Sequence, residues 1–189
     1  MEVIIAVAIM VGILLVIGLL AHDVFDFSSF FQGSFESQQE INQTLQTIIP
    51  EVRSMTRSAA GSYAIETAAS STLTFFSDIE GDGVVERVRD FISSTTLWRG
   101  IVKPTGSPPV YNPASETTRA FIHNLVLTAS STFLYYDESF NGTQSPLTFP
   151  VTINSVRLVE MIVRARTTEG GAQMSAELFL TPRNLRTNF

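Results

Sequence analysis

Residues 1–23 read MEVIIAVAIMVGILLVIGLLAHD, and this stretch decides the fold. Every residue from Val3 to Ala21 is apolar or glycine, and carboxylates at Glu2 and Asp23 mark the two ends of the run. As an α-helix the run is about 28 Å long, close to the roughly 30 Å thickness of bilayer hydrocarbon. We therefore predict a membrane-inserting helix.

Two other kinds of segment contain long apolar runs. A core helix of a soluble protein rarely stays apolar on every face for about five turns. A secretory signal peptide has a basic N-terminal region and a shorter apolar run, whereas Met1 and Glu2 supply no positive side chain. The membrane-inserting helix is the interpretation that fits both observations.

The polar segment after the run continues the helical pattern. Apolar side chains recur there at spacings of three and four residues, in one stripe: Ile41, Leu45, Ile48, Val52, Met55 and Ala59. We expect Pro50 to kink or restart the helix and Gly61 to cap its end. The sequence thus predicts one long helix, with residues 1–22 in the membrane or a filament core and residues 23–60 amphipathic.

Residues 61–189 change to a β pattern and form the predicted head. Segments rich in Thr, Val, Ile, Phe and Tyr alternate with turn residues, and the candidate strands are residues 72–77, 84–92, 96–103, 132–137, 155–166 and 172–181. Residues 117–127 fit either a short helix or another strand. Because no βαβ rhythm is present, we expect an α+β fold in which an antiparallel sheet packs on the amphipathic helix.

Composition excludes several classes of function. The net charge of −6 and the pI near 4.9 argue against binding to nucleic-acid phosphates. The absence of cysteine excludes disulfides and a thiol nucleophile. His22 and His123 have neither a serine elbow nor a zinc-type spacing beside them, and no glycine-rich phosphate loop is present. We therefore expect a protein that is not an enzyme.

The one acidic cluster is DIEGDGVVERVR, residues 78–89. Asp78, Glu80, Asp82 and Glu86 are spaced as at the start of a calcium loop, where oxygen ligands and a glycine surround a hard cation. Arg89 occupies the twelfth position, where an EF-hand requires glutamate, and the flanking residues are typical of strands. A polar hairpin tip and a calcium site both remain open.

Two further patterns concern sugars. Asn42 and Asn141 each begin an N-glycosylation triplet, which also occurs often by chance. An alternative role for the head is a sugar-binding face built from aromatic side chains, although aromatic residues in strands more often pack in the core. These aromatic residues are Phe133, Tyr135, Tyr136 and Phe140.

The segment EVIIAVAIMVGILLVIGLLAHDVF, followed by a long amphipathic helix and a β-rich head, resembles the type IV pilin superfamily, which includes minor pilins and pseudopilins. Residues 72–92, 96–108 and 156–165 are similar to the heads of minor pilins and J-type pseudopilins. Family members carry a basic leader and a Gly-Phe-Thr-Leu-x run before the glutamate. Here Met1 falls on the variable position, and a misplaced start or a trimmed sequence would explain the departure.

The resemblance implies a non-enzymatic structural or assembly subunit of a type IV pilus or a type II secretion-like filament. Its implied partners are other pilin subunits and a prepilin peptidase, with N-terminal methylation. It would cross the cytoplasmic membrane once with its head outside, and then join an extracellular or periplasmic filament. Glu2 would pair with the N-terminal amine of an adjacent subunit.

The alternative is a signal-anchored extracytoplasmic surface protein whose β head binds calcium or sugar. The only cofactor that the sequence suggests is calcium at Asp78, Glu80, Asp82 and Glu86.

Overall fold

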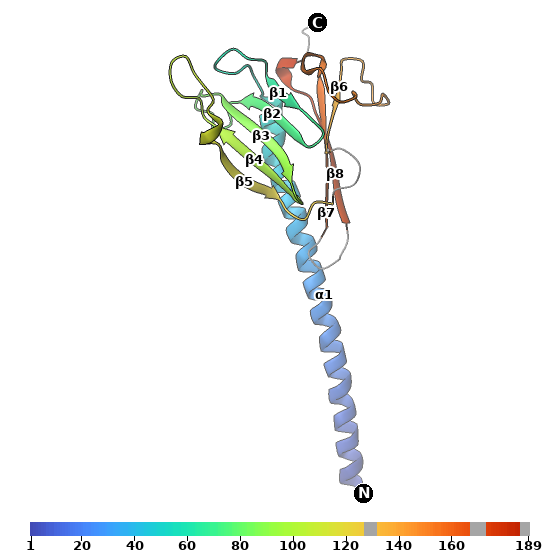
Figure 1. The fold of residues 1–189 in the computed structure, drawn as a ribbon. Helices are drawn as coiled ribbons and strands as arrows, with labels where there is room; N and C mark the ends of the chain where they lie inside the picture. The colour runs from blue at the N-terminus through green and yellow to red at the C-terminus, as the bar shows by residue number, and fades with distance from the viewer. Residues whose placement is uncertain (127–131, 167–172, 186–189) are drawn as a thin grey trace.

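The computed structural model describes residues 1–126, 132–166 and 173–185, without the side chains of residues 20–38, 40, 173 and 174. One long helix, α1 (Glu2–Arg53), leads into a head built from two antiparallel sheets, which is an α+β fold (Figure 1). The five-stranded sheet has the order β1 (Ile65–Ala68), β2 (Thr72–Ser77), β3 (Glu86–Ser93), β4 (Thr96–Val102) and β5 (Thr117–Ile122). The three-stranded sheet has the order β6 (Phe133–Tyr136), β7 (Leu158–Arg166) and β8 (Gln173–Leu180).

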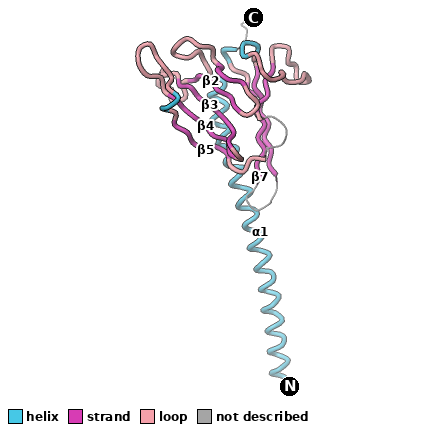
Figure 2. The backbone as a smooth tube through the Cα atoms, viewed as in Figure 1, coloured by secondary structure: helices cyan, strands magenta, loops and turns pink. Residues whose placement is uncertain are grey.

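The second half of α1 packs against both sheets. It contacts β2 and β5 of the larger sheet and β7 and β8 of the smaller one. The first half extends away from the head, and the longer loops gather at the end of the head remote from the N-terminus (Figure 2). The head is therefore assembled around one end of a helix whose other end is free of it.

The first four residues of the predicted apolar stripe seat α1 in the head, whereas Ala59 lies beyond the helix and is exposed. Ile41, Ile48 and Val52 are buried, and Leu45 packs half-buried against the same core. A stripe at this spacing lies on one side of a helix, so it can enter a core while the polar side faces water. Thr44 on the same side donates a hydrogen bond from Oγ1 to the carbonyl of Phe121 at 3.2 Å.

The predicted end of the helix is wrong. α1 continues through Pro50 and ends at Arg53, with Ser54 as its C-cap, so the helix neither restarts at Pro50 nor reaches Gly61. Gly61 instead lies in a turn with φ +84°, a conformation that glycine adopts without strain. Met55, beyond the helix, is still buried.

The strand predictions are largely confirmed, and their grouping into one sheet is wrong. Residues 117–122 form strand β5, so the helical alternative for this segment is excluded. The predicted strand at 155–166 begins only at Leu158, because residues 153–155 form a 3₁₀ turn. Strand β1 was not predicted. The connection at residues 167–172 lies outside the described residues.

The two sheets share one core. Leu125, which follows β5, forms a β-bridge with Ala165 of β7, and the amide of Val126 donates to the carbonyl of Arg164 at 2.7 Å. The hydroxyl of Tyr135 in β6 donates to the carbonyl of Ala69 at 2.9 Å. These contacts join the two sheets, and the buried side chains of both sheets and of α1 form one cluster.

Candidate functional site

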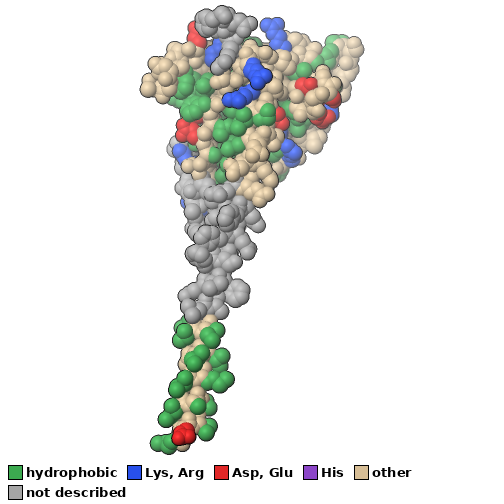
Figure 3. Space-filling view, turned by 180° about the vertical axis from the view of Figure 1, so that it is seen from behind, with side chains coloured by type: hydrophobic (Ala, Val, Ile, Leu, Met, Phe, Trp, Pro, Cys, Tyr) green, Lys and Arg blue, Asp and Glu red, His purple; other side chains and the backbone are tan. Residues whose placement is uncertain are grey.

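The N-terminal part of α1, Glu2–Leu19, is called the apolar stalk below. It is long and apolar enough to cross a membrane, and none of it is buried in the head. Hydrophobic side chains cover the visible face of its free end (Figure 3), and both Val3 and Leu19 are about 70% exposed, at 74% and 69%. Soluble monomers rarely expose apolar patches of this extent, so lipid or other helices are the surroundings that suit this surface.

Glu2 is the only charged side chain of the apolar stalk and lies in the first turn of α1. A carboxylate is favourable at this end of a helix because the first backbone N–H groups carry partial positive charge. The side chain is exposed. Its pairing with the N-terminal amine of a neighbouring subunit stays a prediction, because the structure contains one chain.

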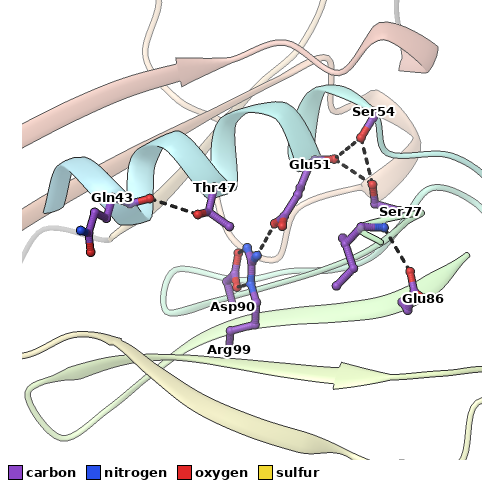
Figure 4. Close-up of polar contacts among 9 residues, drawn as sticks. Gln43, Thr47, Glu51, Ser54, Ser77, Glu86, Asp90 and Arg99 are labelled. Atoms are coloured by element: carbon purple, nitrogen blue, oxygen red, sulfur yellow. Dashed lines mark hydrogen bonds and ion pairs between the residues drawn. The ribbon is translucent and has the colours of Figure 1, made fainter. Parts of the chain in front are cut away.

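Sequence reasoning missed a charged cluster between α1 and the larger sheet, formed by Glu51, Asp90 and Arg99 and called the helix lock below (Figure 4). Arg99 donates from Nε to Asp90 Oδ1 at 2.6 Å and from Nη2 to Oδ2 at 2.7 Å. Its Nη1 donates to Glu51 Oε2. Arg99 and Asp90 are fully buried. Burial raises the pKa of Glu51, and the charge of Arg99 opposes this rise.

Backbone contacts reinforce the helix lock. Ser54 and Ser77 both donate from Oγ to the carbonyl of Glu51 at 3.1 Å (Figure 4). Carbonyls in the last turn of a helix have no partner inside the helix, so these two hydroxyls satisfy one of them. The guanidinium of Arg99 also lies 4.5 Å from the centre of the Phe121 ring. The end of α1 is thus held by polar groups from two strands, Ser77 of β2 and Arg99 of β4.

Residues 78–86, the loop between β2 and β3 together with Glu86, are called the acidic hairpin below. The carboxylate of Asp78 serves the turn itself, because Oδ1 accepts from the amides of Gly81 at 2.7 Å and Asp82 at 3.2 Å. Its Oδ2 accepts from the amide of Gly83 at 2.9 Å. Asp78 therefore shapes the loop and does not belong to the candidate cation cluster.

The other three predicted carboxylates do come together. One oxygen each from Glu80, Asp82 and Glu86 lies within 4.8 Å of the other two. Lys103 Nζ lies 2.7 Å from Glu80 Oε2, and this contact raises the pKa of the lysine. Burial raises the pKa of Glu86, and the charges of Asp82 and Glu80 add to that rise. This is a concentration of negative charge around a buried carboxylate.

A groove of about 530 Å³ separates the acidic hairpin from the end of α1. Its walls include Glu51 and Arg53 of α1, Asp78 and Ile79 of the hairpin, and Arg183 near the C-terminus. The groove carries charges of both signs, so its lining does not favour a ligand of one charge.

The proposed sugar-binding face is wrong for half of its members. Phe133 and Tyr135 point into the core and are at most 1% exposed. Tyr136 lies on the opposite side of β6, where it packs against Phe140 and Phe179. The hydroxyl of Tyr136 donates to Glu160 Oε2, and burial raises the pKa of Tyr136 to about 12.

The remaining candidates are placed as follows. His123 is exposed, and the side chain of His22 lies outside the described part of the chain. Asn42 and Asn141 are both exposed, but Thr44, the third residue of the first triplet, is buried. No family model and no curated protein matches the sequence. The architecture itself, an apolar N-terminal helix followed by antiparallel sheets, is compatible with that of a pilin.

Proposed function

We propose that this protein is a non-enzymatic assembly subunit of a pilin-like filament, either a minor pilin or a pseudopilin. The observation that carries the proposal is the division of α1. Its first 18 residues form an apolar window with none of it buried, and its second half is part of the core of the head. The apolar half of such a helix can leave lipid and pack against neighbouring helices while the head stays folded.

The two glycines of the apolar stalk support helix packing. A Cβ added at Gly12 or Gly18 would meet nothing within 4 Å in this chain, so packing within the chain does not require glycine at either position. Glycine lowers helix propensity by about 1 kcal/mol relative to alanine in water. In membranes, small residues let helices approach closely, and packing against neighbouring helices would explain glycine at positions 12 and 18.

Glu2 is the residue that would select the neighbour. A carboxylate near the lipid or inside a helical filament loses hydration and requires a positive partner. The N-terminal amine of the next subunit would supply it, in surroundings of low dielectric constant where the attraction is strong. In this proposal the cytoplasmic membrane holds the subunit before assembly, with the head outside.

The test separates membrane insertion from assembly. Glu2→Gln, expressed from its own locus, keeps the size of the side chain and removes its charge. We expect an unchanged membrane fraction, because the span becomes more apolar, and a loss of about tenfold or more from the sheared filament fraction. Glu138→Gln, at an exposed carboxylate of the head, is the matched control and should behave as wild type.

Filament incorporation of Glu2→Gln at wild-type level would overturn the pairing role. A signal-anchored surface protein would then be the better interpretation, since its anchor has no need of the charge.

A further inference from the structure

We propose that the acidic hairpin binds one calcium ion through the carboxylates of Glu80, Asp82 and Glu86. The inference does not rest on the proposed function, because it concerns the head alone.

The spacing of the oxygens fits a single calcium ion. One carboxylate oxygen from each residue lies within 4.8 Å of the other two. Calcium binds oxygens at about 2.3–2.6 Å, so two ligands on opposite sides of the ion are about 4.6–5.2 Å apart. The three carboxylates can therefore share one ion with little movement of the hairpin.

Glu86 distinguishes this cluster from an ordinary acidic turn. Its side chain is fully buried, and Oε2 accepts a hydrogen bond from the amide of Ile79 at 3.1 Å. Oε1 is also buried, and it accepts no hydrogen bond from any residue that the structure describes. A buried oxygen without a partner is costly. A cation shared with Glu80 and Asp82 would satisfy it.

Lys103 is a competitor for this position. Its ammonium pairs with Glu80 at 2.7 Å, and both side chains are about half exposed, at 52% and 50%. The ion pair is therefore exposed to water, which competes for both groups, and it contributes little to stability. Calcium carries twice the charge and would replace the ammonium as the partner of Glu80, while also contacting Glu86.

The ligand set favours calcium over magnesium and predicts moderate affinity. Magnesium requires a nearly octahedral shell at about 2.0–2.1 Å and gives up its waters reluctantly, whereas calcium accepts irregular oxygen ligands on a loop. Two of the three carboxylates are exposed on a loop, and we expect a dissociation constant on the order of 10⁻⁴–10⁻³ M, the range of weak calcium sites with few charged ligands and little rigidity. Asp78 fixes the loop that presents Asp82.

The experiment uses the full chain in detergent micelles after removal of metal with EDTA. Calorimetric titration with calcium chloride should show one site, and about 10 mM calcium should raise the melting temperature by mass action on the folded state. Magnesium chloride should bind at least about tenfold more weakly. Absence of calcium binding to the wild-type chain, or equal affinity for magnesium, would overturn the assignment.

Variants locate the ion. Glu86→Gln should weaken calcium binding by about tenfold or more, whereas Glu138→Gln, at an exposed carboxylate outside the cluster, should leave it unchanged. Lys103→Met removes the competing ammonium from an exposed position and should tighten binding by about threefold. Unchanged or weaker binding in Lys103→Met would overturn the site, and this variant decides the matter if Glu86→Gln does not fold.

Discussion

Asp90 and Arg99 lie opposite each other on β3 and β4 and form a two-bond ion pair with both side chains fully buried. The pair lies on the face of the sheet that meets α1, where Glu51 adds a second carboxylate. A buried ion pair contributes little net stability compared with apolar residues of the same shape, but its loss on one side only is severe. The main effect of the helix lock is therefore to fix the position of α1 on the larger sheet.

The first prediction concerns that asymmetry. Arg99→Met leaves Asp90 buried without its partner and should lower the free energy of unfolding by about 3–5 kcal/mol. Chemical denaturation of the full chain in detergent measures this difference. Arg57→Met, at an exposed arginine, is the control and should change little. A loss of less than about 1 kcal/mol in Arg99→Met would contradict this prediction and would mean that Asp90 becomes hydrated or protonated in the variant.

The second prediction concerns Gly100, which lies under the carboxylate of Glu116. A Cβ at Gly100 would overlap Glu116 Oε1, the oxygen that accepts from Arg89 Nε at 2.8 Å. Gly100→Ala must displace the carboxylate, and we expect a loss of about 1 kcal/mol.

In a Glu116→Ala background the same change should be neutral or stabilising, because glycine weakens a strand. Equal effects of Gly100→Ala in both backgrounds would show that the cost arises elsewhere; a double-mutant cycle measures the coupling.

The third prediction concerns pH. A hydrogen bond from Arg89 lowers the pKa of Glu116 from its ordinary value of 4.5. Folding therefore favours the charged form of Glu116. Its contribution to the free energy of unfolding is complete above pH 4.5 and is lost as the pH falls through the lowered pKa of the folded state. The melting temperature of wild type should exceed that of Glu116→Gln near pH 6, and this difference should shrink towards about pH 3. A difference that is constant with pH would contradict the ion pair.

The fourth prediction concerns the apolar stripe of α1. Val52→Asp places an unpaired charge in a fully buried position and should abolish the cooperative melt of the head. Gln46→Asp introduces the same side chain at an exposed position of the same helix and should melt as wild type. The full chain in detergent serves for both variants. Similar melts for the two variants would contradict the packing of α1 in the head.

The helix and most strands were predictable because each repeats one pattern over several turns or residues. The stripe containing Ile41 and Val52 is an example. In β8, the side chains from Ser175 to Leu180 alternate between exposed and more buried positions, as a strand with one face on a core does. Strand β1 has four residues, Ile65–Ala68, which is too short for periodicity to mark it. The division into two sheets depends on long-range pairing, such as that of Leu125 with Ala165, which no local pattern encodes.

The polar sites were predictable only in part. The acidic hairpin stood out as a sequence cluster, but the role of Asp78 depends on backbone amides of the folded turn. The helix lock joins residues up to 48 positions apart, so spacing could not reveal it. One signal was present: in β3, Asp90 shares a face with the buried Val88, and a charge on a buried face requires a partner.

The continuity of α1 gives its residue count a geometric meaning. Each residue of an α-helix turns the chain by about 100° and advances it by about 1.5 Å. Because α1 runs unbroken from Glu2 to Arg53, the azimuth of the head around the axis is set by the number of residues between Glu2 and Glu51. One inserted residue would swing the head by about 100°, whereas seven would return it to within about 20° of its original bearing. The number of residues in α1 therefore sets the direction, around the helix axis, in which the acidic hairpin faces.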